Sequence, residues 1–410
     1  MLLALVGSLV ACTSDPSVAV PDLSAAATTT SVEVADDGVL MLGLLVPLSG
    51  EGAVLGRSVR EGVALAVADI NKAGGVNGAP VRLTVREEGQ NFEETQSAIT
   101  KLAESGVDAI VGPVSSVTAL ASLDQIVSRG LIACSPTAAA MALDDFPDRG
   151  MFVRTIPSDS LQAAAIASAV ERTGTARASI AYIDDAYGRP FAKAVTGELV
   201  ERGIVVSASV PFTPDSTALS AAARVVADDG ADTVVVLAAS IDGPAMLRAL
   251  ATSEGDAVPR YIVNGDQQGE ALAAAASGAF AERVSGVRAI AIGESPEFDE
   301  RLALTAPSSD GLYSLNAYDC ATLIALAAEA NDGLRPTSGS IISASTGGTD
   351  CASFVECAAA ISTGRNTNYN GPGGRVALNA NGDPAAAAFE VFQFGSNGRV
   401  VDRVRINASY

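Results

Sequence analysis

From residue 39 onward, short apolar runs alternate with amphipathic segments in a regular series. Each apolar run has the length of a buried strand, and the segments between the runs place apolar residues at helical spacing. The break at 47–50, for example, is followed by apolar residues on one helical face up to Ile70. The predicted strands of this first series are 40–46, 81–85, 108–111 and 131–134, and the predicted helices are 59–70, 93–103 and one that begins near 115.

The same alternation restarts after 153–157 and continues to Val284. Strands and helices in this order predict a parallel sheet covered by helices on both faces, so the two series predict two Rossmann-like α/β lobes. Ligands of open parallel sheets gather at the carboxyl ends of the strands, and we therefore expect a ligand cleft between the lobes. The predicted strands of the second series are 179–183, 205–210, 233–238 and 261–263, and the predicted helices are 190–201, 217–226, 246–251 and 272–280.

The stretch 111–121 combines the end of a strand, a glycine turn and two hydroxyl groups. Ser115 and Ser116 lie where the next helix begins, because Leu120 and Leu123 start its apolar face. The first turn of a helix offers N–H groups and a positive dipole end to an anion, so we expect a ligand carboxylate to bind there. The alternative is that the two serines only cap their own helix.

The composition excludes several classes of function. The chain of 410 residues is long enough for two domains with a sizeable core. Its 26 Lys and Arg against 47 Asp and Glu give a net charge of −21, which repels nucleic acid and anionic lipid. It contains no histidine, so the commonest general base and metal ligand are missing. We expect no enzyme activity, no metal, no cofactor and no nucleic-acid partner.

The first residues indicate export. Residues 1–12 form an apolar run too short to span a bilayer, which takes about 20 apolar residues. We interpret this run as an export signal that lacks a positively charged start. Its end, Leu9 to Cys12, resembles the bacterial lipobox, in which the cysteine is lipidated after cleavage; the alternative is an ordinary soluble signal. Residues 13–38 are rich in Ser, Thr, Ala and acidic side chains and predict a disordered tether.

The remaining four cysteines fall into two groups. Cys351 and Cys357 lie in a segment rich in Ser, Thr and Gly, and an exported chain meets an oxidising compartment, so we predict a disulfide between them. Cys134 lies on a predicted strand, and Cys320 lies in the helical run 318–328. We interpret both as small core residues, and a pairing between them stays open.

Two acidic pairs follow predicted strands, Glu87 with Glu88 and Asp184 with Asp185. General acid–base catalysis by a carboxylate pair needs a nucleophile or a substrate pocket beside it, and the sequence places no nucleophile next to either pair. We interpret each pair as part of a solvated loop.

Several short motifs carry a family resemblance through their number, order and spacing. The motifs are PLSG at 47–50, GVALAVADINKAGGVNG at 62–78, VGPVSSVTALA at 111–121, FVRTIPSDS at 152–160, AYG at 186–188, AYD at 317–319 and NGD at 381–383. Through these motifs the chain, from residue 39 to the C-terminus, resembles the leucine/isoleucine/valine-binding branch of type I periplasmic binding proteins, the extracytoplasmic receptors of ABC importers.

The resemblance implies two lobes joined by three crossings, which close around a ligand by a hinge motion. It places the first lobe at 39–156 plus 289–378 and the second lobe at 157–288 plus 379–410. Each lobe is thus assembled from two separate parts of the chain.

The resemblance also implies which residues of the first lobe form the pocket. Ser116 falls where the family's serine binds the ligand carboxylate through its hydroxyl and amide. Ser115, next to it in the same motif, and Ser49, in the PLSG motif, are further candidate ligand-binding residues. Thr137, Ala138 and Ala139 fall on the loop that holds the same carboxylate. Because Ala139 stands where the family has a hydroxyl residue, a contact of about 1.5–3 kcal/mol is lost unless Thr137 replaces it.

Other pocket positions follow from the same resemblance. Tyr187 would close the pocket from the second lobe, or else it only packs at the edge of that lobe. Asp266 falls where the family has a carboxylate that meets the ammonium group of an amino acid. A charge closed into a cleft without a partner is costly, so a cationic group on the ligand would suit Asp266. The alternative is that Asp266 is a solvated turn residue. Leu55 and Ala239 replace larger aromatic residues, which leaves room for a bulkier ligand.

The resemblance implies a lipoprotein that binds an amino acid, branched-chain or related, or a similar small polar solute, and passes it to ABC permease subunits. We expect a monomer that is attached through a lipid anchor to the outer face of the cell membrane, or is periplasmic. Two alternatives are a ligand-sensing domain of the same fold that signals to a membrane partner, and a binder of an amide or a small carboxylate.

Overall fold

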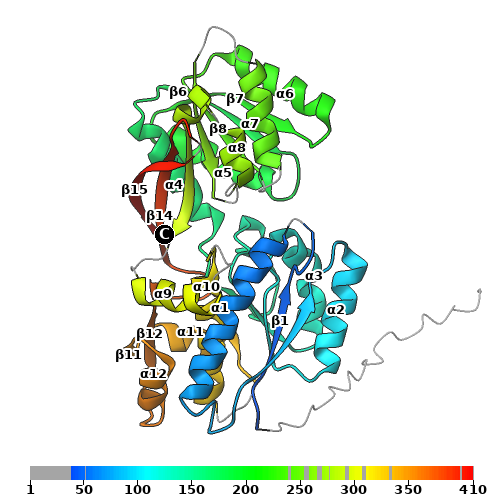
Figure 1. The fold of residues 1–410 in the computed structure, drawn as a ribbon, viewed down its shortest axis with the longest axis vertical. Helices are drawn as coiled ribbons and strands as arrows, with labels where there is room; N and C mark the ends of the chain where they lie inside the picture. Colours follow the sequence, from blue (N-terminus) through cyan, green and yellow to red (C-terminus); the bar gives the residue numbers. More distant parts are fainter. Residues whose placement is uncertain are drawn as a thin grey trace, which may run out of the picture. The chain divides into compact units, whose positions relative to one another are not determined.

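The computed structural model describes residues 38–409 except for 51, 239–241, 254–257, 266–269, 277, 291–294, 307–310, 332–334 and 398 (Figure 1). The predicted signal with Cys12 and the predicted tether up to residue 37 lie outside the described residues, as do the predicted site residues Ala239 and Asp266. The strands form two large sheets and one small sheet, and each large sheet is the centre of one α/β lobe.

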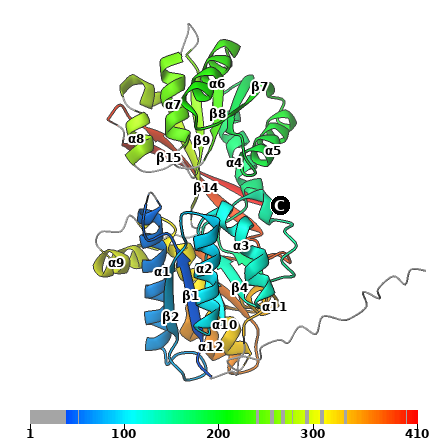
Figure 2. The ribbon, with the colours of Figure 1, turned by 90° about the vertical axis from the view of Figure 1, so that its right-hand side faces the viewer.

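The sheet of the first lobe has the strand order β2-β1-β3-β4-β5, and all of its strands run parallel. Helices α1 and α10 cover one of its faces, and α2 and α3 cover the other (Figures 1 and 2). The strands are β1 (Met41–Val46), β2 (Arg82–Glu87), β3 (Ala109–Val111), β4 (Ile132–Ser135) and β5 (Phe152–Arg154), and the helices are α1 (Ala53–Lys72), α2 (Phe92–Glu104), α3 (Ser116–Ser128) and α10 (Ser314–Ala330).

The sheet of the second lobe has the order β15-β14-β10-β9-β8-β6-β7. Its strands are β6 (Arg177–Ile183), β7 (Val205–Phe212), β8 (Thr233–Leu237), β9 (Arg260–Asn264), β10 (Val284–Ile290), β14 (Ala386–Phe394) and β15 (Val400–Ser409). Helices α4 and α5 lie on one face, and α6, α7 and α8 lie on the other (Figure 2). These helices are α4 (Asp159–Arg172), α5 (Gly188–Glu201), α6 (Ser216–Asp229), α7 (Asp242–Ser253) and α8 (Glu270–Ala275).

The remaining elements lie after β10, except for a short 3-10 helix at Met141–Leu143 and another at Gly278–Arg283. They form the small three-stranded sheet and the helices beside it, and the predicted disulfide Cys351–Cys357 is present there with a Cα–Cα distance of 5.2 Å. These elements are α9 (Pro296–Thr305), α11 (Ser338–Ser345), β11 (Thr349–Cys351), α12 (Phe354–Ile361), β12 (Thr367–Gly371) and β13 (Gly374–Arg375).

Helix α10 is the most deeply buried helix of the first lobe, with every residue from Ala317 to Ala328 buried. It lies directly against α1, and the contact is closest at Gly62. A Cβ atom at Gly62 would stand 2.1 Å from the carbonyl oxygen of Ser314, so only glycine allows this approach. The two helices thereby hold the early and late parts of the chain together in one lobe.

The structure confirms the predicted α/β fold with two lobes and parallel-rich sheets, and each predicted strand and helix has a counterpart. It departs from the prediction at the C-terminus, where β14 and β15 join the second sheet in antiparallel orientation. Helix α4 was also not predicted, because it is rich in alanine and buried on nearly all sides and so lacks an amphipathic period. The residue boundaries of the two lobes stay a prediction.

Candidate ligand-binding site

The predicted pocket residues of the first lobe follow the carboxyl ends of its parallel strands. Ser49 follows β1, Ser115 and Ser116 follow β3, and the loop 136–140 follows β4. Parallel strands end at the same edge of a sheet, so these segments lie along one edge. The structure therefore gathers the first-lobe residues of the predicted site in one place.

The turn between β3 and α3 depends on Gly112. Its φ is +110°, and a Cβ atom there would stand 2.3 Å from the carbonyl oxygen of Leu45. Only glycine fits this conformation and this approach. The turn ends at Ser115, the N-cap of α3, whose hydroxyl accepts a hydrogen bond of 3.5 Å from Thr118 N–H. Ser115 thus has the capping role that was the alternative to ligand binding.

Ser116, the first residue of α3, is arranged differently. Its hydroxyl oxygen accepts a hydrogen bond of 3.2 Å from the N–H of Ala140, which brings the loop 136–140 against the start of the helix. In the part of the chain that the structure describes, the N–H groups of Ser116, Val117 and Ala139 have no hydrogen-bond partner. Three N–H donors are therefore available around Ser116, where a carboxylate was predicted.

The loop 136–140 is held in place by two hydroxyl groups. The hydroxyl of Ser135 donates to Pro113 O at 2.6 Å and accepts from Ala138 N–H at 2.9 Å. The hydroxyl of Thr137 donates to Val114 O at 2.7 Å. The single hydroxyl proton of Thr137 is thus used inside the first lobe, so Thr137 does not replace the contact that Ala139 lacks.

The sequence analysis did not single out Arg154, although it organises the same loop. Its side chain is fully buried, and its Nη1 donates to the carbonyl oxygens of Ala138 and Ala140 at 3.2 Å each. Its guanidinium also pairs with Asp144, and its Nε donates to Asp383 at 2.6 Å. An arginine at the end of a buried strand was a signal in the sequence for a buried ion pair, because a buried cation needs carboxylate partners.

Glu88 contradicts the interpretation of its acidic pair as a solvated loop. Only 2% of its surface is exposed, and its carboxylate accepts hydrogen bonds from Val114 N–H at 2.9 Å and Ser115 N–H at 3.1 Å. Burial raises the pKa of Glu88 to about 7, because the surrounding protein disfavours the charged form. An internal carboxylate thus already occupies the two N–H groups that precede Ser116.

In the second lobe, Tyr187 is part of a hydrogen-bonded chain. Only 7% of its surface is exposed, its ring packs edge-on against Phe191, and its hydroxyl accepts from the side-chain amide of Asn264 at 3.0 Å. The Asn264 Oδ1 accepts in turn from Ala238 N–H at 3.0 Å. The carboxyl ends of β6, β8 and β9 are thereby connected, and the sequence analysis did not single out Asn264, which makes both bonds.

The acidic pair beside Tyr187 also has partners. The carboxylate of Asp185 accepts from the N–H groups of Tyr187 at 2.9 Å and Gly188 at 2.7 Å, so it fixes the start of α5. Asp184 forms an ion pair of 2.7 Å with Arg189. Asp185 therefore shapes the loop that carries Tyr187.

The two remaining described positions, Ser49 and Leu55, lie at the start of α1. Ser49 is exposed in the turn after β1, and Leu55 is half-buried in the first turn of the helix. The backbone of the preceding turn is held by Glu87, whose carboxylate oxygens accept from Leu48 N–H at 3.0 Å. Leu55 packs against the core of the first lobe.

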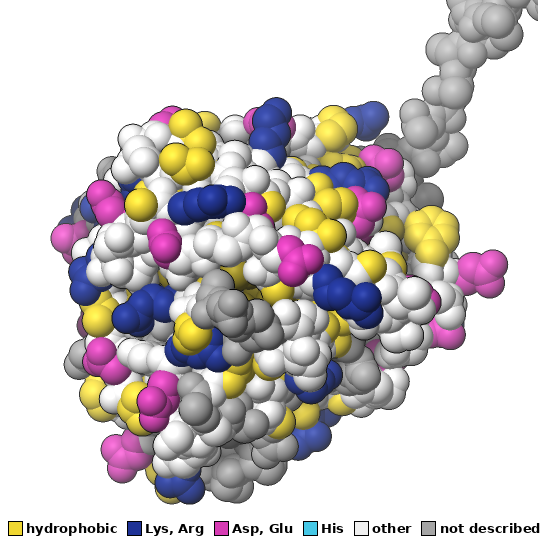
Figure 3. Space-filling model, turned by 90° about the horizontal axis from the view of Figure 1, so that it is seen from above, with side chains coloured by type: hydrophobic (Ala, Val, Ile, Leu, Met, Phe, Trp, Pro, Cys, Tyr) yellow, Lys and Arg dark blue, Asp and Glu magenta, His cyan; other side chains and the backbone are white. Residues whose placement is uncertain are grey.

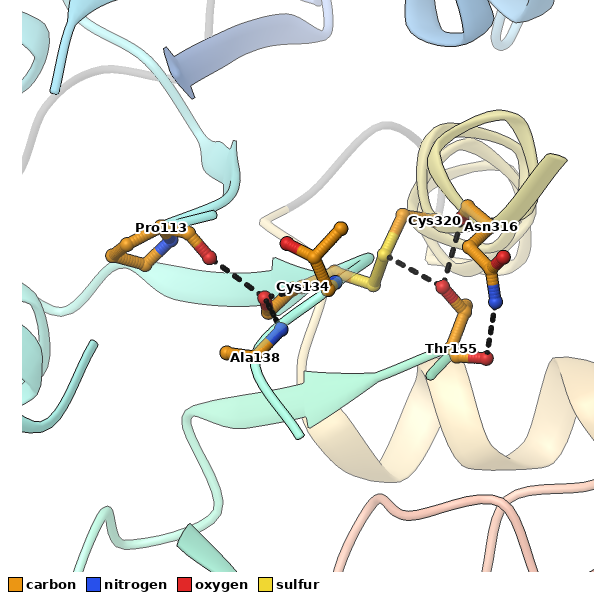
Figure 4. The surroundings of a disulfide bond; sticks show 8 residues. Pro113, Cys134, Ala138, Thr155, Asn316 and Cys320 are labelled. Carbon is orange, nitrogen blue, oxygen red and sulfur yellow. Dashed lines mark hydrogen bonds between the residues drawn. A yellow bond between two sulfur atoms is a disulfide. The ribbon is translucent and has the colours of Figure 1, made fainter. Parts of the chain in front are cut away.

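Cys134 and Cys320 form a second disulfide with a Cα–Cα distance of 5.7 Å, so they are not separate core thiols (Figure 4). The bond joins β4 to α10 beside the first crossing between the lobes. There the hydroxyl of Thr155 donates to Asn316 O at 2.8 Å, and the Asn316 side chain donates to Thr155 O at 2.8 Å. The disulfide thus holds the loop 136–140 and the first crossing to the same helix.

A small cavity of about 50 Å³ lies at the crossings, and the residues that line it are not those of the predicted pocket. Asp319 lines it with only 5% of its surface exposed, and its Oδ1 accepts from the Tyr369 hydroxyl at 2.8 Å. Burial raises the pKa of Asp319 to about 7. Residues of all three crossings line the cavity, namely Thr155, Pro157, Ala289, Ile290, Val376, Pro384, Ala386 and Ala387.

Charge is distributed over the surface rather than gathered in one place on the face that Figure 3 shows. Basic, acidic and apolar side chains are interspersed there. Within the described residues, no group of three or more Cys, Asp and Glu side chains could hold a metal ion, and no helix is long and apolar enough to cross a membrane.

Comparison with known sequences identifies the family. The profile described as "Periplasmic binding protein" matches residues 40–399. The Leu/Ile/Val-binding protein BraC3 of Rhizobium johnstonii is 29% identical over 231 residues, which cover 55% of this chain and 61% of that protein. The substrate-binding protein BasB of the chemotactic signal transduction system of Halobacterium salinarum is 30% identical over 367 residues, which cover 84% of each chain. The chain belongs to the type I periplasmic binding proteins of the branched-chain amino acid family.

Solved structures show the same fold. The substrate-binding protein LivJ of Streptococcus pneumoniae, solved with isoleucine, has a TM-score of 0.71 at 20% identity and covers 90% of this chain and 99% of its own. A solute-binding protein of R. palustris, solved with benzoate, has a TM-score of 0.68 at 18% identity and covers 88% and 95%. Proteins of this family bind small-molecule ligands outside the cytoplasm and work with ABC transporter permeases.

Proposed function

We propose that this protein captures a small solute that carries a carboxylate, with a branched-chain or related amino acid as the first candidate, and delivers it to ABC permease subunits. The observation that carries the proposal is the set of free N–H donors at Ser116, Val117 and Ala139. Charge-assisted bonds from such donors to a carboxylate are stronger than neutral ones. Isoleucine and benzoate, which are bound by two proteins of the same fold, are both carboxylates.

Two further elements of the proposal concern residues outside the described ones. Asp266 comes directly after Gly265 and β9 in the sequence, and in this proposal it would meet the ammonium group of an amino acid. Lipidation of Cys12 would attach the protein to the outer face of the membrane, and the tether would let the lobes reach a permease.

A second candidate function is ligand sensing. BasB matches the larger part of this chain, and its name assigns it to a chemotactic signal transduction system. In that case the same capture of a solute would be read by a membrane receptor rather than by a permease. Deletion of the gene separates the two, since a transporter role predicts loss of solute uptake and a sensor role predicts loss of taxis with uptake intact.

A thermal-shift screen of the purified protein tests the capture of a carboxylate. The ligands are amino acids, their amides, benzoate and other small carboxylates, polyamines and sugars. A ligand at about 100 times its Kd stabilises the folded state by about 2.7 kcal/mol, which gives a clear rise in the melting temperature. The proposal predicts a rise with carboxylates, and a rise only with sugars or polyamines contradicts it. Loss of the shift for amino acids but not for benzoate in Asp266→Ala supports Asp266 as the ammonium partner.

A further inference from the structure

Two carboxylates would accept hydrogen bonds at the N-terminus of α3, one from Glu88 and one from the proposed ligand. Glu88 accepts hydrogen bonds from the N–H groups of Val114 and Ser115, and the proposed ligand carboxylate binds at Ser116, the next residue. Consecutive Cα atoms lie about 3.8 Å apart, so the two carboxylates would be separated by roughly one or two residue lengths. At this distance two like charges in a partly buried site repel each other strongly.

Among the described residues, no positive side chain relieves this repulsion. Within the described residues, no Lys or Arg forms an ion pair with Glu88. From β2 the facing group is Glu87, which is itself acidic, and from α3 it is the hydroxyl of Thr118. From α2, Thr95 donates to the backbone carbonyl oxygen of Glu88 at 2.7 Å.

Glu94, an acidic residue at the start of α2, accepts hydrogen bonds from Gln90 N–H at 2.8 Å and from the Asn91 side chain at 2.9 Å. These partners are neutral, so the start of α2 also offers no positive charge to Glu88. The simplest way to remove the repulsion is therefore to neutralise Glu88 itself.

We propose that Glu88 takes up one proton from solvent when a ligand carboxylate binds at Ser116, so that Glu88 makes ligand affinity dependent on pH. This inference rests on the proposed function. The proton adds to one carboxylate oxygen of Glu88, and the bound pair then carries one negative charge instead of two. The Thr118 hydroxyl, which donates to the ionised carboxylate, can accept from the protonated one, because a hydroxyl is both donor and acceptor.

The direction of the effect follows from the charges. The pKa of Glu88 is raised to about 7 by burial before any ligand is present, and a second carboxylate raises it further. Above this pKa the ligand must bring a proton with it, so affinity falls as pH rises. The limiting slope for one proton is about tenfold in Kd per pH unit. The chain has no histidine, so the side chain that most often titrates in this range is absent.

Titration calorimetry of the full chain with L-isoleucine and with benzoate tests the proposal, in buffers of different ionisation enthalpy between about pH 6 and about pH 8. We expect uptake of up to one proton per ligand above about pH 7, together with the fall in affinity. In Glu88→Gln the proton uptake should disappear while binding persists. Asp319→Asn is the matched control, because Asp319 has the same raised pKa of about 7 but lies at the crossings, and it should keep the uptake.

The outcomes separate the two proposals. Binding by the wild-type chain without proton uptake, or uptake that persists in Glu88→Gln, overturns the role of Glu88 and leaves the solute-binding function intact. The absence of binding by any carboxylate at any pH overturns the proposed function, and the role of Glu88 with it. If Glu88→Gln does not fold, the proton uptake of the wild-type chain still tests the role of Glu88. Glu88→Asp, which keeps a carboxylate, should then also take up a proton when the ligand binds.

Discussion

The Nε atom of Arg154 donates a hydrogen bond of 2.6 Å to Oδ1 of Asp383, although 229 residues separate the two in the chain. Arg154 ends β5, at the first crossing between the lobes, and Asp383 lies in the segment of the third crossing. The same guanidinium binds the carbonyl oxygens of Ala138 and Ala140. One buried side chain thus connects two crossings to the loop that faces Ser116.

Arg154→Met should strongly destabilise the protein, because it leaves Asp383 and Asp144 without their buried cation. Breaking a buried ion pair lowers the free energy of unfolding by about 3–5 kcal/mol. Urea denaturation of the variant and the wild type measures this loss. Arg177→Met is the matched control, since the Arg177 side chain is 48% exposed and its pair with Asp229 should contribute at most about 1 kcal/mol. Equal losses in the two variants would contradict a central role for Arg154.

Ser116→Ala should weaken the binding of a carboxylate ligand. The variant loses a hydroxyl donor to the carboxylate and the oxygen that holds Ala140 N–H, and a hydrogen bond to a charged group contributes about 1.5–3 kcal/mol. We therefore expect a rise in Kd of roughly ten- to a hundredfold by titration calorimetry.

Ser115→Ala is the control for Ser116→Ala. It removes the N-cap of α3 and should lower the free energy of unfolding by about 1 kcal/mol with a much smaller change in Kd. If the two serines exchanged these effects, Ser115 would be the ligand residue and Ser116 would not.

Tyr187→Phe should destabilise the second lobe by about 1–3 kcal/mol, because the buried side-chain amide of Asn264 loses its acceptor. Tyr182→Phe provides the comparison, since the Tyr182 hydroxyl has no hydrogen-bond partner among the described residues. Urea denaturation of both variants checks the difference. No difference between them would show that the bond to Asn264 contributes nothing to stability.

Removal of the two disulfides should have unequal effects on stability. Cys134–Cys320 closes a loop of 186 residues and Cys351–Cys357 closes one of 6 residues. In the chain-entropy account these loops correspond to about 5 kcal/mol and about 2 kcal/mol. Thermal denaturation of the paired alanine variants, Cys134→Ala with Cys320→Ala and Cys351→Ala with Cys357→Ala, measures the two contributions. The account is wrong if the short loop contributes as much as the long one.

The free energy of unfolding should fall as pH rises toward neutrality. Burial raises the pKa of Glu88 from 4.5 to about 7, so the folded chain binds more protons there than the unfolded chain. The stabilisation from this group is complete below 4.5 and is lost as pH rises through about 7, a change of about 3 kcal/mol. Urea denaturation at a series of pH values should show a shallower fall in Glu88→Gln.

The regular part of the fold could be predicted from the sequence, because apolar periodicity reports which face of an element is buried. It succeeded for α1, where Val59, Val63, Ala66 and Ile70 of the predicted apolar face are buried and Val67 is partly buried. It failed for α4, which is buried on nearly all sides, so no face is distinguished. The antiparallel pairing of β14 with β10 joins residues about a hundred positions apart, which local patterns do not report.

The parts of the candidate site that lie in one continuous segment could be predicted from the sequence. The parts that depend on contacts between distant segments could not. Ser116 could be proposed from the sequence because a strand, a turn and a helix follow one another there. Glu88, Arg154 and Asn264 were missed as parts of the candidate site, because their roles depend on partners 14 to 229 residues away. A polar residue at or just after the end of a strand is the signal that all three share.

The most direct test of the central claim is a crystal structure of the protein with the carboxylate that gives the largest thermal shift. We expect a carboxylate oxygen at about 2.7–3.2 Å from the backbone nitrogen of Ser116, with Ala139 N–H as a second donor. A ligand whose carboxylate lies elsewhere, with the N–H groups of Ser116 and Ala139 bound only to water, would contradict this account of the site.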